Sequence, residues 1–419
     1  MFCMFIKSVT IKNFRNILNC SLKFKKGFNL IVAPNATGKT NVLEAISVLS
    51  YGYSVRAKDQ KDLSPSPSLL TRTQNPLFHK DLLNSLEASN NLDILYNNPT
   101  TAQAVSSLSS SSVSKIPQTD LQPTTIEGLV DTKRGQKKVV CRMTFQAGRV
   151  EKAFLIDKRK VNFSQFVGNL FTIFFSSSTI DLVSRSPSLR RKFVDNIMVL
   201  LYPGYYNSIL EYHKSLIRRN FVIRSGKLET LDQWSKITAH YGAILISQRN
   251  IFFKSLNKFL EKQQSGLEVV YKPSVEIDDV FDEDPESKFL YLLNKERQND
   301  IKLGRTTIGP HLDDWQLFSV KNDEKRNLGR FGSRGEQRVG MSAVVFSLVS
   351  FVGEILGDKP VILADDIFSD LDERYQEILL NRSLDIGCQV IATSTPNVFM
   401  SIKKFERFGN INAIEFSLD

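Results

Sequence analysis

The sequence has few cysteines, no long apolar run and a shortage of acidic residues. Its four cysteines form no Cys-x-x-Cys pair, which argues against a zinc site or a disulfide framework and suits a reducing cytosol. No stretch approaches the roughly 20 apolar residues of a membrane span. Residues 1–17 carry lysine and arginine between their apolar residues, unlike a signal peptide. We therefore expect a cytoplasmic protein without a membrane partner.

Lysine and arginine outnumber aspartate and glutamate by 55 to 44, which gives a formal net charge of +11. An excess of this size is typical of proteins with an acidic partner, and nucleic acid is the first candidate. A basic surface that is simply solvated is the alternative. The 419 residues are enough for two or three structural units with a large buried core.

The N-terminal residues show strand patterns followed by a helix pattern. Alternating apolar and polar residues predict strands over 4–12 and 17–24, and a short apolar run predicts a buried strand over 28–32. The helix predicted over 38–50 places Val42, Leu43, Ile46 and Leu49 on one apolar face.

Strand and helix patterns also alternate near the C-terminus. The predicted helices cover 337–356 and 371–381, and the predicted strands cover 360–364, 388–392 and 414–417. This order predicts an α/β fold with a mostly parallel sheet that is built from both ends of the chain.

Two middle segments differ from these ends. Residues 98–127 are rich in Ser, Thr, Gln and Pro, which predicts an exposed, flexible insertion. Residues 181–304 have mostly helical periodicity and predict an inserted second domain. The expected parts are therefore 1–180, the helical domain at 181–304, and 305–419, which completes the α/β domain.

A loop with phosphate-binding spacing connects the strand over 28–32 to the helix over 38–50. Inward-pointing backbone N–H groups and the helix N-terminus would hold the phosphates of ATP. Lys39 would reach the β- and γ-phosphates, and the Thr40 hydroxyl would bind Mg²⁺. Ala33 stands where glycine is usual, which is tolerable if its φ is negative. The predicted cofactor-binding residues of this loop are Ala33, Pro34, Asn35, Ala36, Thr37, Gly38, Lys39, Thr40 and Asn41.

Two carboxylates follow the apolar strand at 360–364. Asp365 would hold Mg²⁺, directly or through water, and Asp366 would act as the general base that polarises the attacking water. An ordinary helix N-cap is the alternative for an aspartate pair in this position. The loop at 33–40 favours the catalytic interpretation, because the two motifs together make a nucleotide site.

A third motif, residues 333–338 (SRGEQR), opens the helix upstream of the aspartate strand. Its serine, glycine and glutamine form an anion-binding pattern at a helix start, although a simple capped helix would look the same. Its position resembles that of the signature motif of ABC-type ATPases, which presses on the γ-phosphate bound by another subunit. The residues assigned to ATP by this interpretation are Ser333, Gly335, Gln337 and, after the aspartate strand, Asp370.

Most of the chain resembles the RecF family, bacterial DNA repair proteins with an ABC/SMC-like P-loop ATPase head. The nucleotide motifs alone are shared by many ATPases, whereas the Ser-Pro-x-x-Arg-Arg and Leu-x-x-Arg-Asn patterns are far more specific. Ala33 and Glu336 depart from the family pattern. The matching segments are 11–16, 35–46, 181–183, 186–195, 212–220, 309–314, 333–338 and 365–372.

The resemblance implies a protein that binds ATP, forms an ATP-dependent homodimer and hydrolyses ATP slowly, as a switch. It also implies binding to single- and double-stranded DNA, with RecR and RecO as partners and RecA loaded indirectly at single-strand gaps or stalled forks. Phosphate contacts are expected from two basic clusters, although each could be a solvated face. Those clusters are Arg190, Arg191 and Lys192, and Arg218 and Arg219.

Three other classes of protein share parts of this pattern. An SMC-type ATPase would place hundreds of coiled-coil residues between its nucleotide motifs, and this chain has no such span. A fused nuclease would need a metal domain after Asp366, where only 53 residues remain. A non-hydrolysing, nucleotide-gated DNA clamp stays open as the alternative.

Overall fold

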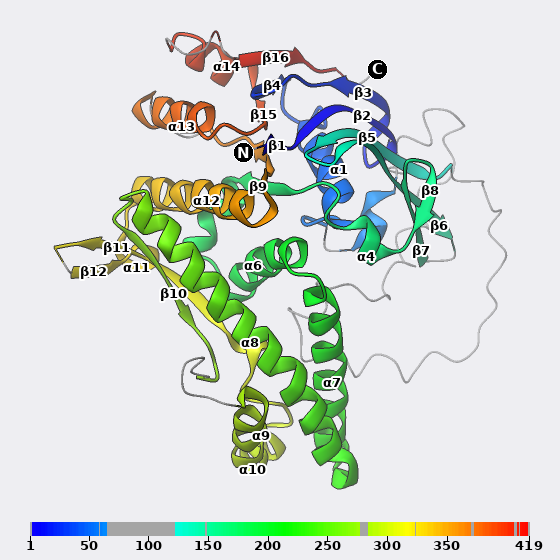
Figure 1. Ribbon diagram of the computed structural model, residues 1–419, viewed down its shortest axis with the longest axis vertical. Coiled ribbons are helices and arrows are strands. Elements are labelled where there is room, and N and C mark those ends of the chain that lie inside the picture. The colour runs from blue at the N-terminus through cyan, green and yellow to red at the C-terminus, as the bar shows by residue number, and fades with distance from the viewer. Residues whose placement is uncertain are drawn as a thin grey trace, which may run out of the picture. The chain divides into compact units, whose positions relative to one another are not determined.

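Both ends of the chain contribute strands to one parallel sheet (Figure 1). Strand β4 (Phe28–Val32) lies between β15 (Val390–Ser394) and β16 (Ile411–Glu415) and pairs in parallel with both. Strand β14 (Val361–Asp365) pairs in parallel with β15, and β9 (Thr172–Ser176) completes the order β16-β4-β15-β14-β9. The predicted parallel sheet with strands from both termini is confirmed.

The computed structural model describes residues 2–57, 59–64, 122–146, 149–276, 284–322, 324–369, 373–405, 409 and 411–417. These residues belong to two compact units. Unit 1 consists of Met1–Phe174 and Pro360–Asp419, and unit 2 consists of Phe175–Lys359. Residues 305–359, which the sequence analysis grouped with the α/β domain, thus pack within the helical unit.

A second, antiparallel sheet in unit 1 has the order β3-β2-β5-β6-β7-β8. Its strands are β2 (Phe5–Phe14), β3 (Ile17–Lys23), β5 (Thr124–Thr132), β6 (Gly135–Gln146), β7 (Arg149–Ile156) and β8 (Arg159–Val161). The prediction of a flexible insertion was wrong for residues 124–127, because they begin β5, where Thr124 and Ile126 are buried. Residues 98–121 of that prediction lie outside the described residues.

Helix α1 (Lys39–Tyr51) packs against both sheets of unit 1, against β2 and β5 on one side and β14 and β15 on the other. It is therefore buried nearly all round rather than along the single apolar face that the sequence predicted. Gly128 of β5 allows this packing, since a Cβ there would lie 2.7 Å from Cδ1 of Leu49.

The described residues of unit 1 form five further elements. They are β1 (Phe2–Cys3), the 3-10 turn η1 (Gln60–Leu63), α4 (Phe163–Phe166), α13 (Glu373–Asp385) and α14 (Pro396–Ile402).

Unit 2 combines long helices with the small antiparallel sheet β10-β11-β12. The strands of this sheet are β10 (Leu267–Lys272), β11 (Asp314–Lys321) and β12 (Glu324–Asn327), and unit 2 also contains the short strand β13 (Asp358–Lys359). Its helices are α5 (Ser177–Ile180), α6 (Pro187–Leu201), α7 (Tyr205–Ser225), α8 (Leu231–Lys262), α9 (Pro285–Lys295), α10 (Arg297–Leu303), α11 (Leu328–Phe331) and α12 (Arg334–Leu356). Its 3-10 turns are η3 (Asp181–Val183), η4 (Leu228–Thr230) and η5 (Pro310–Leu312).

Helix α12 is long and apolar enough to cross a membrane by length and composition, contrary to the prediction that no stretch of the chain approaches a membrane span. Its most apolar window has a mean hydropathy of 2.0, and 72% of that window is buried inside the protein. It packs against α8, so its hydrophobicity is that of a core helix in unit 2.

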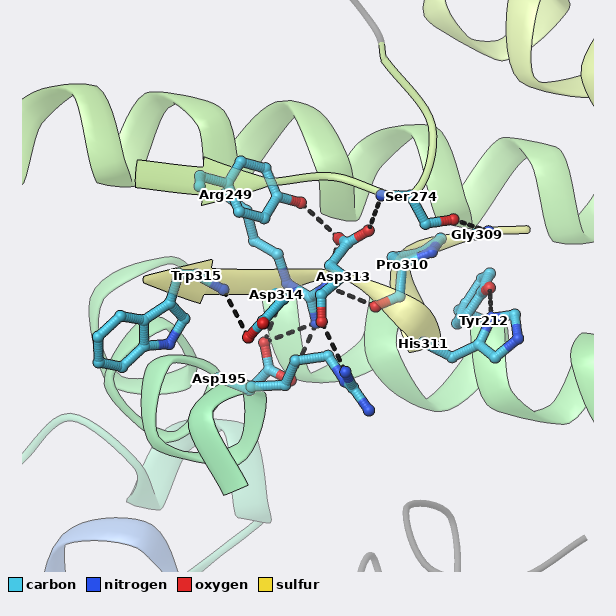
Figure 2. A network of polar contacts seen from close by, with 12 residues as sticks. Asp195, Tyr212, Arg249, Ser274, Gly309, Pro310, His311, Asp313, Asp314 and Trp315 are labelled. Carbon is cyan, nitrogen blue, oxygen red and sulfur yellow. Dashed lines mark hydrogen bonds and ion pairs between the residues drawn. The ribbon is translucent and has the colours of Figure 1, made fainter. Parts of the chain in front are cut away.

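A buried ionic network joins the helices of unit 2 to the segment 309–314 (Figure 2). The guanidinium of Arg249 on α8 contacts the carboxylate of Asp195 on α6 at 2.9 Å and that of Asp313 at 2.8 Å. Arg249 also donates to the carbonyl of Pro310 at 2.8 Å. The segment 309–314 therefore has a structural role in this unit, because it shares the guanidinium of Arg249 on α8 with Asp195 on α6.

The same segment fixes a residue that was predicted to bind DNA. Arg190 donates two hydrogen bonds to the Asp314 carboxylate, at 2.7 and 2.8 Å, and the Arg190 side chain is only 8% exposed. Arg191 donates to the Asp313 carbonyl at 2.6 Å and is half-buried. The prediction of phosphate contact is wrong for Arg190, because its guanidinium is buried in an ion pair with Asp314.

Arg219 on α7 is likewise an internal residue. It forms an ion pair with Asp300 at 2.7 Å and donates to Thr306 Oγ1 at 2.6 Å, with its side chain 1% exposed. The neighbouring Asn220 accepts from the backbone N–H of Thr306 at 2.8 Å. The Leu-x-x-Arg-Asn pattern thus anchors α10 and the following loop to α7, and the DNA-binding prediction is wrong for Arg219. Arg218, in contrast, is exposed.

Replacing Arg219 by Ala leaves the Asp300 carboxylate buried and unpaired, so it should lower the free energy of unfolding by about 3–5 kcal/mol. Arg218→Ala is the matched control, and an exposed residue of this kind should change stability by no more than about 0.5 kcal/mol. Urea unfolding followed by circular dichroism measures both. Equal stability of the two variants would contradict the assignment of Arg219 as a structural residue.

Burial also keeps two histidines of unit 2 neutral. Burial lowers the pKa of His213 to about 4, although the nearby Asp195 opposes the shift. Burial lowers the pKa of His311 to about 3, with the adjacent His213 adding to the effect. The Nδ1 atom of His311 is 2.7 Å from the hydroxyl of Tyr212.

Below the ordinary histidine pKa of about 6.5, the unfolded chain binds a proton that the folded protein does not, so the free energy of unfolding falls as the pH falls. With a folded pKa of about 4, His213 alone should lower the free energy of unfolding by about 2 kcal/mol between pH 7.5 and pH 5. Unfolding measured across this range should show a steeper loss in the parent than in His213→Gln. Identical slopes would contradict the neutral, buried state of His213.

Candidate nucleotide-binding site

The loop between β4 and α1 has the backbone that phosphate binding requires. Gly38, the residue before α1, has a φ of +93°, and Ala36 has a φ of +62°, so the chain turns sharply into the helix. Ala33 is not among the positive-φ residues, which meets the condition stated for its replacement of glycine. Alanine in place of the usual glycine at position 33 is therefore compatible with the backbone of the loop.

The N-terminus of α1 is open to an anion. Gly38 has no side chain to cap the helix, and the first turn carries no acidic residue. The first N–H groups of a helix have no partner within it, and the helix dipole favours a negative charge there. The start of α1 therefore supplies several donors that phosphate oxygens could satisfy.

Lys39 folds back over the loop. Its ammonium donates to the carbonyls of Ala33 and Pro34, at 2.6 Å each, and the residue is 8% exposed. Burial lowers the pKa of Lys39, while the carboxylates of Asp366 and Asp365 oppose that shift. A cation is thus already held inside the loop, within the field of two carboxylates.

Asp365 meets the loop from the end of β14. Its Oδ1 accepts hydrogen bonds from the hydroxyls of Thr40 and Thr393, each at 2.9 Å. A hydroxyl and a carboxylate at this distance can belong to one Mg²⁺ coordination shell, since Mg²⁺ usually takes one or two protein ligands and keeps several waters. The structure thereby brings together the two residues that were predicted to bind the metal.

Asp366 has a different environment from its neighbour. Its side chain is exposed, and its φ of +52° turns the chain out of the strand. Its backbone N–H donates to Thr393 Oγ1 at 2.9 Å, and its carboxylate accepts from the Ser369 hydroxyl. Asp365 is thus buried at the end of β14, whereas the side chain of Asp366 is exposed. Their roles as metal ligand and general base stay predictions.

The predicted signature residues lie in unit 2, at the start of α12. Ser333 caps the helix, accepting from the Glu336 N–H at 3.2 Å, and Glu336 accepts from the Ser333 N–H at 2.8 Å. Gln337 donates to the carbonyls of Leu328 and Gly332, at 2.9 and 3.1 Å, and Gly335 lies in the first turn. Asp370 lies outside the described residues.

The sequence model of the RecF/RecN/SMC N-terminal domain matches residues 5–411 of this chain. The chain belongs to the RecF/RecN/SMC family. It is 27% identical over 404 residues to the DNA replication and repair protein RecF of Lachnoclostridium phytofermentans, covering 94% of this chain and 93% of that protein. The RecF protein of Clostridium botulinum is 29% identical over 401 residues, with the same coverage.

Solved RecF structures share the fold. The recombination mediator protein RecF-ATPrS of the RecFOR pathway superposes with a TM-score of 0.72 and 26% identity, covering 94% of this chain and 93% of that one. RecF-ATP of the same pathway gives a TM-score of 0.70 at 26% identity, covering 94% and 92%. The predicted ABC/SMC-like ATPase head is thereby confirmed as the fold of this RecF/RecN/SMC family member.

Two contacts beside the loop were not predicted from the sequence, although Arg15 and Asn16 both lie in the matching segment 11–16. Asn16, in the turn between β2 and β3, accepts from the Asn41 side chain at 2.6 Å and lies so close to Gly38 that a Cβ there would meet it at 2.8 Å. Arg15 contacts the fully buried Glu44 of α1 at 2.8 Å. A signal for this second contact was Glu44, an acid within an apolar helix that requires a buried partner.

Proposed function

We propose that this chain is a RecF-type ATP switch of recombinational DNA repair. It binds ATP with Mg²⁺, pairs with a second copy in the ATP state, and is reset by slow hydrolysis. The observation that carries the proposal is the uncapped start of α1 facing Asp365, with Lys39 held inside the loop. Triphosphate binding uses all three features, because it needs N–H donors, a cation and a metal ligand.

Each residue of the site has a defined task in this proposal. The α1 N–H groups hold the phosphate oxygens, and Lys39 exchanges the Ala33 and Pro34 carbonyls for the β- and γ-phosphates. Thr40 and Asp365 would hold Mg²⁺, which supplies positive charge to the phosphates when it is bound. Asp366 accepts the proton of the attacking water, and Thr393 fixes its backbone.

The second copy completes the site. Ser333, Gly335 and Gln337 of one chain would contact the γ-phosphate held by the other, as the signature motif of ABC-type ATPases does. Hydrolysis removes that phosphate and releases the pair. Thr393 or Ser394 stands where such ATPases commonly carry a histidine that senses the γ-phosphate, and the absence of histidine there favours slow turnover.

The DNA-binding part of the proposal rests on charge. The net charge of +11 favours sequence-independent contact with the phosphates of single- or double-stranded DNA. Of the predicted contacts, Arg191, Lys192 and Arg218 remain candidates after Arg190 and Arg219 are excluded. Family membership favours a cytoplasmic protein that acts with RecR and RecO and helps load RecA at gaps or stalled forks.

Asp366→Asn should abolish ATP turnover while preserving ATP binding and ATP-dependent pairing, because it removes the base and keeps the loop. Lys39→Ala is the matched variant, which should lose both binding and pairing. Phosphate release and light scattering with and without ATP measure the two activities. A parent protein without turnover would favour the non-hydrolysing DNA clamp, and turnover retained in Asp366→Asn would show that another group is the base.

A further inference from the structure

The residue two positions before Ser333 is a strongly exposed aromatic. Phe331 is 67% exposed, whereas Leu328, at the other end of the same single-turn helix α11, is 2% exposed. Leaving a phenyl ring in water sacrifices the hydrophobic stabilisation that its burial would give. Single exposed apolar side chains are common on protein surfaces, so it is the position of Phe331 beside the predicted signature residues that makes it a candidate for contact with a partner.

The backbone of the turn that carries Phe331 is held by side-chain hydrogen bonds and by close packing at two glycines. The Asn327 side chain caps α11 by accepting from the Arg330 N–H at 3.1 Å. Gly329 and Gly332 admit no side chain, since a Cβ would lie 2.3 Å from the Val183 carbonyl and 2.6 Å from the Leu328 carbonyl, respectively. Gln337 then ties the turn to α12 through its two hydrogen bonds to the carbonyls of Leu328 and Gly332. Phe331 is therefore held in position before any partner arrives, which lowers the entropic cost of contact.

The surroundings of Phe331 indicate the chemistry of that partner. Arg330, Ser333 and Arg334 are all exposed, so the ring is flanked by two cations and a hydroxyl. The nearby carboxylate of Glu336 is paired with Arg326, so it does not neutralise Arg330 and Arg334. A surface that joins an apolar ring to positive charge is complementary to a bound nucleotide, which has a polyanionic triphosphate and a flat base.

We propose that Phe331 is a docking residue that packs against the ATP-bearing face of a second copy of this chain. The inference rests on the proposed function, because it takes ATP-dependent pairing as given and names a residue that stabilises it. Gln337 acts as a positioning residue for the Phe331 turn. Phe331 makes an apolar contact beside the nucleotide, and Arg330 and Arg334 face its negative charge.

The test compares Phe331→Ser with Phe221→Ser. Phe221, on α7, is 61% exposed and is the matched control for loss of an exposed phenylalanine in the same unit. Sedimentation velocity with a slowly hydrolysed ATP analogue gives the dissociation constant of the pair. Phe331→Ser should raise it about tenfold or more, as truncation of an aromatic contact residue does. Phe331→Leu, which keeps an apolar side chain, should recover most of the loss, and Phe221→Ser should match the parent.

Binding of a fluorescent ATP analogue, measured at protein concentrations too low for the parent to pair, should be unchanged in Phe331→Ser, because the residue does not support the loop at 33–40. The thermal midpoint without nucleotide should also be unchanged, because Phe331 is not part of the core. Parent-like pairing of Phe331→Ser overturns the inference and leaves the proposed function standing. A parent that does not pair with ATP overturns both. Parent-like pairing with weakened DNA binding in Phe331→Ser also overturns the inference, and identifies DNA as the occupant of this surface.

Discussion

The carboxylate of Asp365 connects the distant parts of the nucleotide site. Its Oδ1 accepts hydrogen bonds from Thr40, near the start of α1, and from Thr393, near the end of β15. These contacts are possible because β4, β14 and β15 are parallel, so their carboxyl ends meet at one edge of the sheet. Burial of α1 between two sheets then fixes the loop that precedes it.

Buried charge has a different role in unit 2. Two of the most family-specific sequence patterns, Ser-Pro-x-x-Arg-Arg and Leu-x-x-Arg-Asn, place Arg190 and Arg219 in ion pairs inside the unit. Arg249 of α8 pairs both with Asp195 of α6 and with Asp313 of a third such segment, 309–314. Such pairs add little net stability, but removal of one partner is costly, so they favour a single arrangement of α6, α7 and α8. The two sequence patterns that are most specific to the family thus shape this unit.

The sequence predicted the strand, turn and helix around the loop because these signals are local and are read from neighbouring residues. The structure also brings Thr40 and Asp365 into contact, and the roles of these residues toward ATP and Mg²⁺ stay predictions. Burial of Arg190 and Arg219 could not be predicted in this way, because their partners Asp314 and Asp300 are far away in the chain. The burial of α1 on all sides was missed for the same reason, since only tertiary structure places β2 and β5 against it.

We expect Asp365 and the loop to form one site for ATP and Mg²⁺, and calorimetric titration of ATP can decide this. The titration uses the parent and Asp365→Asn, each with Mg²⁺ and with a chelator. Mg²⁺ should tighten ATP binding to the parent, and Asp365→Asn should lose about tenfold or more of that gain. A parent affinity that does not depend on Mg²⁺, or a full Mg²⁺ effect in Asp365→Asn, would show that Asp365 and the loop do not share a metal-dependent site.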